Sequence, residues 1–229
     1  MKILFEATTA SELKEVLAKA NISVPARTEG RTTDHVERSD IANLLSAMMQ
    51  AELITYPVTL THRDRPDFLL SMGNRSIGIE HTEAIHQNEA YKDSLREEIN
   101  GTRTWLISRV LPGEPKKKRK ELIKEIEENN PGDGWDEDSP EIEWADAMLY
   151  SVRKKLTAIS KAGFDRFDEN WLLVYDNWSL PAPDIRKAAP LFLHVVKQSE
   201  ALKEFDRIFV MRNKLFCDVS AMGVRLQTV

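Results

Sequence analysis

Two acidic residues, Asp67 and Glu80, stand in a segment that otherwise has the pattern of a small apolar hairpin, RPDFLLSMGNRSIGIEHT. Its Gly73-Asn74 dipeptide favours a two-residue hairpin turn. Closing the hairpin there places Asp67 opposite Glu80 on neighbouring antiparallel strands. Carboxylates in that position repel each other by about 0.2–1 kcal/mol unless a cation or a proton lies between them. The pair therefore predicts a divalent metal site, although acids on a solvated strand face are the common alternative.

The alternation of side chains along a strand assigns these acids to one face of the hairpin. The opposite face is apolar and carries Phe68, Leu70, Met72, Ile77 and Ile79, with His81 in the same phase. The face with the acids carries Asp67, Leu69, Ser71, Ser76, Gly78, Glu80 and Thr82. We therefore expect one face in the core and the other at a site, in a register that depends on the predicted turn.

Composition sets the class of protein. The chain has 229 residues, of which 41% are hydrophobic and 30% charged, which is typical of a soluble globular protein. No apolar run approaches the ~18 residues of a membrane span, so no membrane association and a cytoplasmic location are expected. A single cysteine, Cys217, excludes an internal disulfide and a cysteine-based zinc cluster. The net charge of −5 gives no global basic field for nucleic acid.

The order of elements predicts an α/β fold. Residues 1–30 are predicted as a small N-terminal appendage and residues 31–229 as the main domain. A helix over 34–53, a strand over 56–61 and the hairpin come first, and a helical insertion is expected over about 86–138. A helix over 139–162 follows, with Ser139 as its N-cap and Pro140 at its first position. The run NWLLVYDNW then predicts a central strand buried on both faces.

Further elements follow the central strand. A helix is expected over 183–202, interrupted or kinked at Pro190. The runs DRIFVMR and KLFCDVS then predict a strand pair that turns at Asn213 and Lys214. Earlier in the chain, the basic run 116–120 is interpreted as a solvated helix start in preference to a phosphate contact.

This order of helix, acid-bearing hairpin, helix and central strand resembles the core of the PD-(D/E)XK nuclease superfamily, the restriction-endonuclease-like fold. Pro66 and Asp67 stand at the PD of the motif, and Glu80-His81-Thr82 stands at the E-x-K. The similarity covers about residues 34–180, and its motif is short. It implies a central mixed sheet flanked by helices and interrupted by the helical insertion.

The resemblance also implies a chemistry, namely metal-dependent hydrolysis of phosphodiester bonds in nucleic acid, with DNA favoured over RNA. Asp67 and Glu80 would hold Mg²⁺ or Mn²⁺, and the backbone carbonyl of His81 would be a further ligand. Thr82 occupies the position of the motif lysine and cannot supply a cation. On the 139–162 helix, Lys155 borders the apolar stripe whereas Lys154 points away from it.

We therefore expect Lys155 to orient the attacking water, with an ordinary snorkelling lysine as the alternative. Glu37, one turn before Ile41, either contacts the metal or its water shell, or is a charge that the N-terminal helix dipole favours. A catalytically degenerate module that binds nucleic acid or a protein partner stays open as the competing function. The sequence also leaves open whether the chain forms a homodimer.

Overall fold

The computed structural model describes residues 2–26, 29–99, 106–129, 134–160, 163–213 and 215–228. Within these ranges the protein is a mixed α/β structure with one eight-stranded sheet and six α-helices. The strands lie in the sheet in the same order as in the chain, from β1 to β8. None of the helices in the described ranges is long and apolar enough to cross a membrane.

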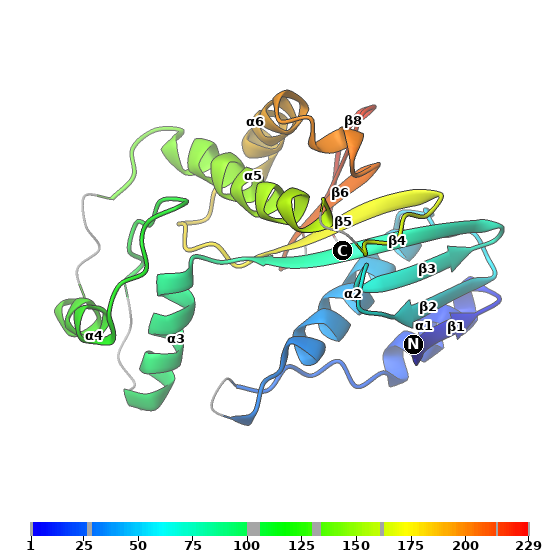
Figure 1. Cartoon of the computed structure of the whole chain (residues 1–229), viewed down its shortest axis with the longest axis horizontal. Coiled ribbons are helices and arrows are strands. Elements are labelled where there is room, and N and C mark those ends of the chain that lie inside the picture. Colours follow the sequence, from blue (N-terminus) through cyan, green and yellow to red (C-terminus); the bar gives the residue numbers. More distant parts are fainter. Residues whose placement is uncertain are drawn as a thin grey trace.

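The sheet is antiparallel at both ends and parallel in its middle (Figure 1). Antiparallel pairing joins β1 (Lys2–Ala7), β2 (Val58–His62), β3 (Phe68–Met72) and β4 (Arg75–Ala84). Parallel pairing joins β4 to β5 (Glu169–Asp176) and β5 to β6 (Arg207–Arg212). The last strands, β7 (Leu215–Ser220) and β8 (Gly223–Thr228), return to antiparallel pairing. The sequence predicted β6 and β7 but not β8.

Helices cover both faces of the sheet and also extend beyond it (Figure 1). One face packs against α1 (Ala10–Lys19) and α2 (Thr33–Gln50), and the other against α5 (Ser139–Ile159) and α6 (Ile185–Gln198). A short 3₁₀ helix, η2, covers Ala201–Lys203. The helix α3 (Gln87–Ile99) follows the C-terminal end of β4, and α4 (Arg119–Glu128) lies beyond α3, both within the range 86–138 where a helical insertion was predicted.

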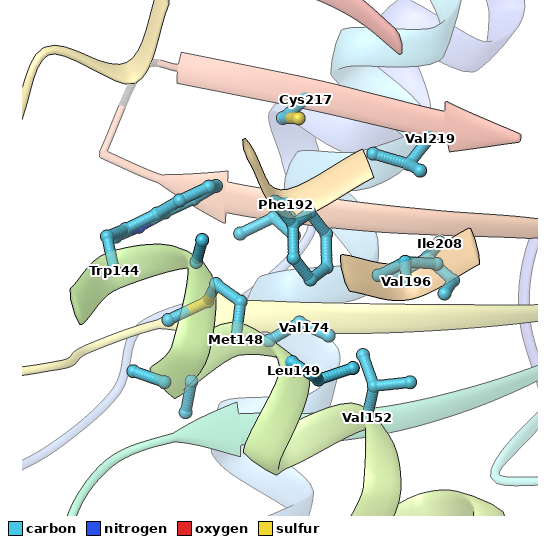
Figure 2. Close-up of a cluster of buried hydrophobic side chains, with 14 of the residues drawn as sticks. Trp144, Met148, Leu149, Val152, Val174, Phe192, Val196, Ile208, Cys217 and Val219 are labelled. Carbon is cyan, nitrogen blue, oxygen red and sulfur yellow. The ribbon is translucent and has the colours of Figure 1, made fainter. Parts of the chain in front are cut away.

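The core on the α5 and α6 face is continuous from helix to sheet, as Figure 2 shows. Met148, Val152 and Phe192 from the helices meet Val174 and Ile208 from the sheet. Burying such side chains contributes about 1.5–3 kcal/mol each, so this core fixes α5 against the sheet. Any side chain on the sheet-facing border of α5 is thereby held at a fixed place over β4.

The predicted hairpin register is confirmed from Phe68 to Met72, but Asp67 lies before the start of β3, so the predicted cross-strand pairing of Asp67 with Glu80 is not part of the ladder. Met72 pairs with Arg75, Leu70 with Ile77 and Phe68 with Ile79. The five apolar side chains of the hairpin all lie in the core beneath α1 and α2, as the alternation predicted, namely Phe68, Leu70, Met72, Ile77 and Ile79. Gly73 has a φ of +60°, which suits the tight turn that closes the hairpin.

Several predicted boundaries changed. Ser139 is the first residue of α5 and not its N-cap, a position that Asp138 takes, so Pro140 follows within the first turn. The expected end of this helix, Ala162, lies outside the described residues. The helix α6 runs through Pro190 to Gln198. The predicted 1–30 appendage supplies β1 to the common sheet, and its leucines on α1 enter the same core as α2.

Candidate active site

Asp67 lies in the turn that leads into β3, and the turn is held from both sides. The backbone N–H of Arg63 donates to the carbonyl of Asp67 at 2.8 Å. The ring of Pro66 rests on Gly78 of β4, where an added Cβ would lie 2.9 Å from Pro66 Cγ and 2.8 Å from Phe167 Cδ2. Only a glycine lets the turn approach the strand so closely, and this places Asp67 on the α5 side of the sheet.

Glu80 lies on β4 beside the central strand, where it pairs in register with Leu172. The residue is buried, with 6% of its surface exposed. Burial and the neighbouring Asp67 carboxylate raise the pKa of Glu80 above its ordinary value, and Lys155 opposes that shift. The carboxylate pair, Asp67 and Glu80, is therefore a site where negative charge is concentrated and only partly hydrated.

Lys155 completes this arrangement from α5. Its Nζ lies 2.5 Å from Glu80 Oε2 and 3.3 Å from Asp67 Oδ2. Burial alone would lower the pKa of Lys155, but the two carboxylates outweigh it and raise that pKa, so the side chain stays an ammonium. The next residue back, Lys154, is exposed and lies over the ring of Tyr150. Of these two neighbouring lysines of α5, Lys155 thus contacts the acids and Lys154 is exposed to solvent.

The backbone of β4 takes part in the site as well. The N–H of His81 donates to Asp67 Oδ2 at 2.7 Å. The ladder between β3 and β4 ends at Ile79, and among the described residues no strand pairs with this edge of β4 from residue 80 to residue 84. In a strand the N–H and C=O of one residue point to the same side. The His81 carbonyl therefore points toward the open edge, on the same side as the Asp67 carboxylate.

A pocket of about 470 Å³, the edge pocket, opens along this free edge of β4. Its lining includes Arg31, Thr33, Glu37, Glu83, Ser94 and Lys155. These residues come from the start of α2, the end of β4, α3 and α5, so the walls are drawn from four distant parts of the chain. The ammonium of the site is therefore accessible from a defined cavity.

Glu37 lies in the edge pocket, where its side chain contacts a histidine and not the carboxylate pair. Its Oε2 lies 3.1 Å from His62 Nε2 on β2. Among the contacts of the described residues, none joins Glu37 to Asp67 or Glu80. The structure thus brings Asp67, Glu80 and Lys155 together and places Glu37 on the adjoining wall.

Sequence reasoning missed a buried pair on the other face of β4. His81 Nε2 lies 2.7 Å from Asp40 Oδ2, and these residues are 7% and 4% exposed. Burial raises the pKa of Asp40, and the hydrogen bond with His81 opposes that shift. A signal was available, because Asp40 precedes Leu44 by four residues and therefore shares the inner stripe of α2.

The carboxylate pair fits a small hard cation. Within the described ranges no cluster of three or more histidine, cysteine, aspartate or glutamate side chains is placed to hold a metal ion. Mg²⁺ is commonly bound by one or two carboxylates, with waters and substrate phosphates completing its shell. Two neighbouring carboxylates therefore suit Mg²⁺ or Mn²⁺ better than a metal that needs an all-protein ligand set.

Comparisons of the chain with protein-family models, with curated proteins and with solved structures gave no match. The functional conclusion therefore depends on the geometry of the site itself.

Proposed function

We propose that this protein is a metal-dependent nuclease with a restriction-endonuclease-like fold, hydrolysing phosphodiester bonds with Mg²⁺ or Mn²⁺ at Asp67 and Glu80. The observation that carries the proposal is the position of Lys155, whose ammonium contacts both carboxylates from a different element. In this proposal Lys155 would take the part of the motif lysine, whose position in the sequence is occupied by Thr82.

Each group has a role that follows from its place. Asp67 and Glu80 would hold the cation, which when bound would supply Lewis-acid activation of the phosphate and of a water. Lys155 would donate a hydrogen bond to the attacking water and stabilise the negative charge that develops on the phosphate. The hydrogen bond from the His81 N–H fixes the Asp67 carboxylate, so the acid keeps its orientation without substrate.

The contact between Lys155 and Glu80 also favours a second function. An ammonium 2.5 Å from Glu80 already neutralises part of the charge that a metal would neutralise. In a degenerate module, the lysine would be a permanent substitute for the cation and would tie α5 to β4. Such a protein would bind nucleic acid or a protein partner without cleaving.

A cleavage assay separates these functions. Wild type with Mn²⁺ is expected to cut a fluorescent DNA oligonucleotide, and Lys155→Ala is expected to lower the rate by about 10²–10³-fold, the usual effect of removing an electrostatic stabiliser. Lys154→Ala is the matched control and should keep the wild-type rate, because Lys154 is exposed and contacts Tyr150. Thr82→Lys tests whether the family position can still support the reaction.

Two outcomes would contradict the nuclease. Equal rates for wild type and Lys155→Ala would remove the lysine from the mechanism. Absence of cleavage in wild type on single-stranded and duplex DNA and RNA, with cleavage gained by Thr82→Lys, would identify a degenerate module.

A further inference from the structure

The edge pocket has a shape that bears on the substrate. It lies between the start of α2 and α3, and Lys155, whose ammonium contacts both Asp67 and Glu80, forms part of its wall. Its volume of about 470 Å³ falls in the range of about 300–1,000 Å³ that holds compact organic ligands. A nucleic-acid duplex is far too wide to enter such a cavity, whereas one nucleoside is of the right size.

The charges of the residues that line the edge pocket indicate which part of a nucleotide would enter it. The acids Glu37 and Glu83 are among the residues that line the edge pocket, and negative charge there disfavours a phosphate. Arg31 contributes the opposite charge, but its Nη2 lies 3.8 Å from Glu83 Oε1 and is thus partly neutralised. A base is uncharged and carries N–H donors along its edge. Acidic side chains accept such donors, as they do from the amino group of cytosine.

Glu83 is held ready for this purpose. Its Oε1 already accepts a hydrogen bond from Asn177 Nδ2 at 2.8 Å, which fixes the carboxylate at the end of β4. Its backbone belongs to the free edge of the strand, beyond the last pair between β3 and β4. The lining also includes Thr33 of α2 and Ser94 of α3, which are hydroxyl-bearing residues.

We propose that the edge pocket takes one unstacked, amino-bearing base next to the scissile phosphate, so that the substrate is single-stranded or locally unpaired nucleic acid. The inference rests on the proposed nuclease function and adds its substrate class. Bases inside a duplex reach a pocket only after unpairing and unstacking, which costs a few kcal/mol. Single strands avoid that cost.

The first experiment fills the pocket from its two walls. Ser94→Trp and Thr33→Trp place an indole in the cavity from α3 and α2, and Ser11→Trp on the exposed face of α1 is the matched control. Thermal melting of each variant checks that it folds. With Mn²⁺, wild type and Ser11→Trp are expected to cut a single strand at least about tenfold faster than the same sequence in a duplex. Both pocket-filling variants should lose about tenfold on the single strand.

A binding measurement separates the pocket from the chemistry. A single-stranded oligonucleotide carrying 2-aminopurine, an adenine analogue that brightens when unstacked, is titrated with protein in Ca²⁺. Brightening with wild type and its loss in Ser94→Trp are expected. Glu83→Gln should reduce the preference for oligo-dC over oligo-dT. Glu6→Gln, a control at an exposed residue of β1, should leave that preference unchanged.

The two proposals fail differently. If duplex and single strand are cut equally and Ser94→Trp behaves as wild type, the substrate inference is overturned and the nuclease stands. If nothing is cut but 2-aminopurine brightens in wild type alone, the base pocket is supported and the nuclease is overturned. If neither cleavage nor brightening occurs, both are overturned.

Discussion

Two consecutive residues of β4 carry buried polar side chains to opposite faces of the sheet, and the partners of these side chains differ between the two faces. On the α5 face, Glu80 and Asp67 share the ammonium of Lys155. On the α2 face, His81 is paired with Asp40 alone. Both pairs are fixed by the same strand, so the comparison isolates what surrounds each group.

The difference lies in charge and access. Two carboxylates and one ammonium leave a net negative charge on the α5 face, and the side chains of Lys155 and Asp67 are 21% and 19% exposed. On the α2 face one carboxylate meets one imidazole, with side chains only 5% and 6% exposed. An accessible, under-neutralised group of acids can bind a cation, whereas a buried one-to-one pair stabilises the fold. Substitutions on each face and the pH dependence of metal binding test this difference between the two faces.

Removing the cation of the α5 face is expected to have the largest effect on stability. Lys155→Ala leaves two partly buried carboxylates without a neutralising cation and should lower the free energy of unfolding by about 3 kcal/mol. Mn²⁺ should restore much of that loss, because a cation that binds only the folded state stabilises it. Urea denaturation with and without Mn²⁺ measures both. Lys154→Ala, with no change in either condition, is the control.

Removing the acid of the α2 face is expected to cost less and to leave the metal site intact. Asp40→Ala deprives buried His81 of its partner, which costs about 2 kcal/mol. Affinity for Mn²⁺ should stay at the wild-type value, since Asp40 lies on the other side of β4. Weaker metal binding in a folded Asp40→Ala protein would show that the two faces are coupled.

The pH dependence of metal binding should reflect the raised pKa of Glu80. Metal binding needs the ionised carboxylate, so affinity falls as pH falls through that pKa. The fall should therefore begin above the ordinary glutamate pKa of about 4.3, and it can reach about tenfold per pH unit. Because Lys155 lowers the pKa of Glu80, the Lys155→Ala curve should move to higher pH. Calorimetric Mn²⁺ titrations at several pH values test the shift.

The smallest predicted effect concerns the turn that positions Asp67. Gly78→Ala would press a methyl group against the rings of Pro66 and Phe167, and we expect a loss of about 1 kcal/mol from overpacking. The turn should also move away from β4 and weaken Mn²⁺ binding. A folded Gly78→Ala protein with unchanged stability would mean that the approach of Pro66 is not tightly constrained.

Features of the fold and the site that depend on residues close together in the sequence were predictable, and those that depend on residues far apart were less so. The hairpin register could be predicted from Gly73-Asn74 and the alternation that follows, because both are local. Helical phase likewise distinguished Lys155 from Lys154 before any contact was known. The partner of Lys155, 75 and 88 positions away at Glu80 and Asp67, could be inferred only through the family resemblance.

Other features depend on packing between distant elements and left weaker signals. Asp40 has the helical phase of a core residue, but nothing near it in the chain indicates His81 as its partner. The edge pocket joins residues 31 to 155, and its existence depends on where the α3 and α4 insertion stands. The last strand of the sheet, β8, was missed because Gly223–Thr228 has a weak apolar alternation.

The most direct test of the central claim is a calorimetric titration with Mn²⁺ at neutral pH on wild type, Asp67→Ala and Asp40→Ala. If the accessible acids on the α5 face form a metal site, wild type and Asp40→Ala should bind with the same affinity and Asp67→Ala should lose binding. Equal heats for wild type and Asp67→Ala would contradict the account, because Asp67 and Glu80 would then be only the partners of a structural lysine.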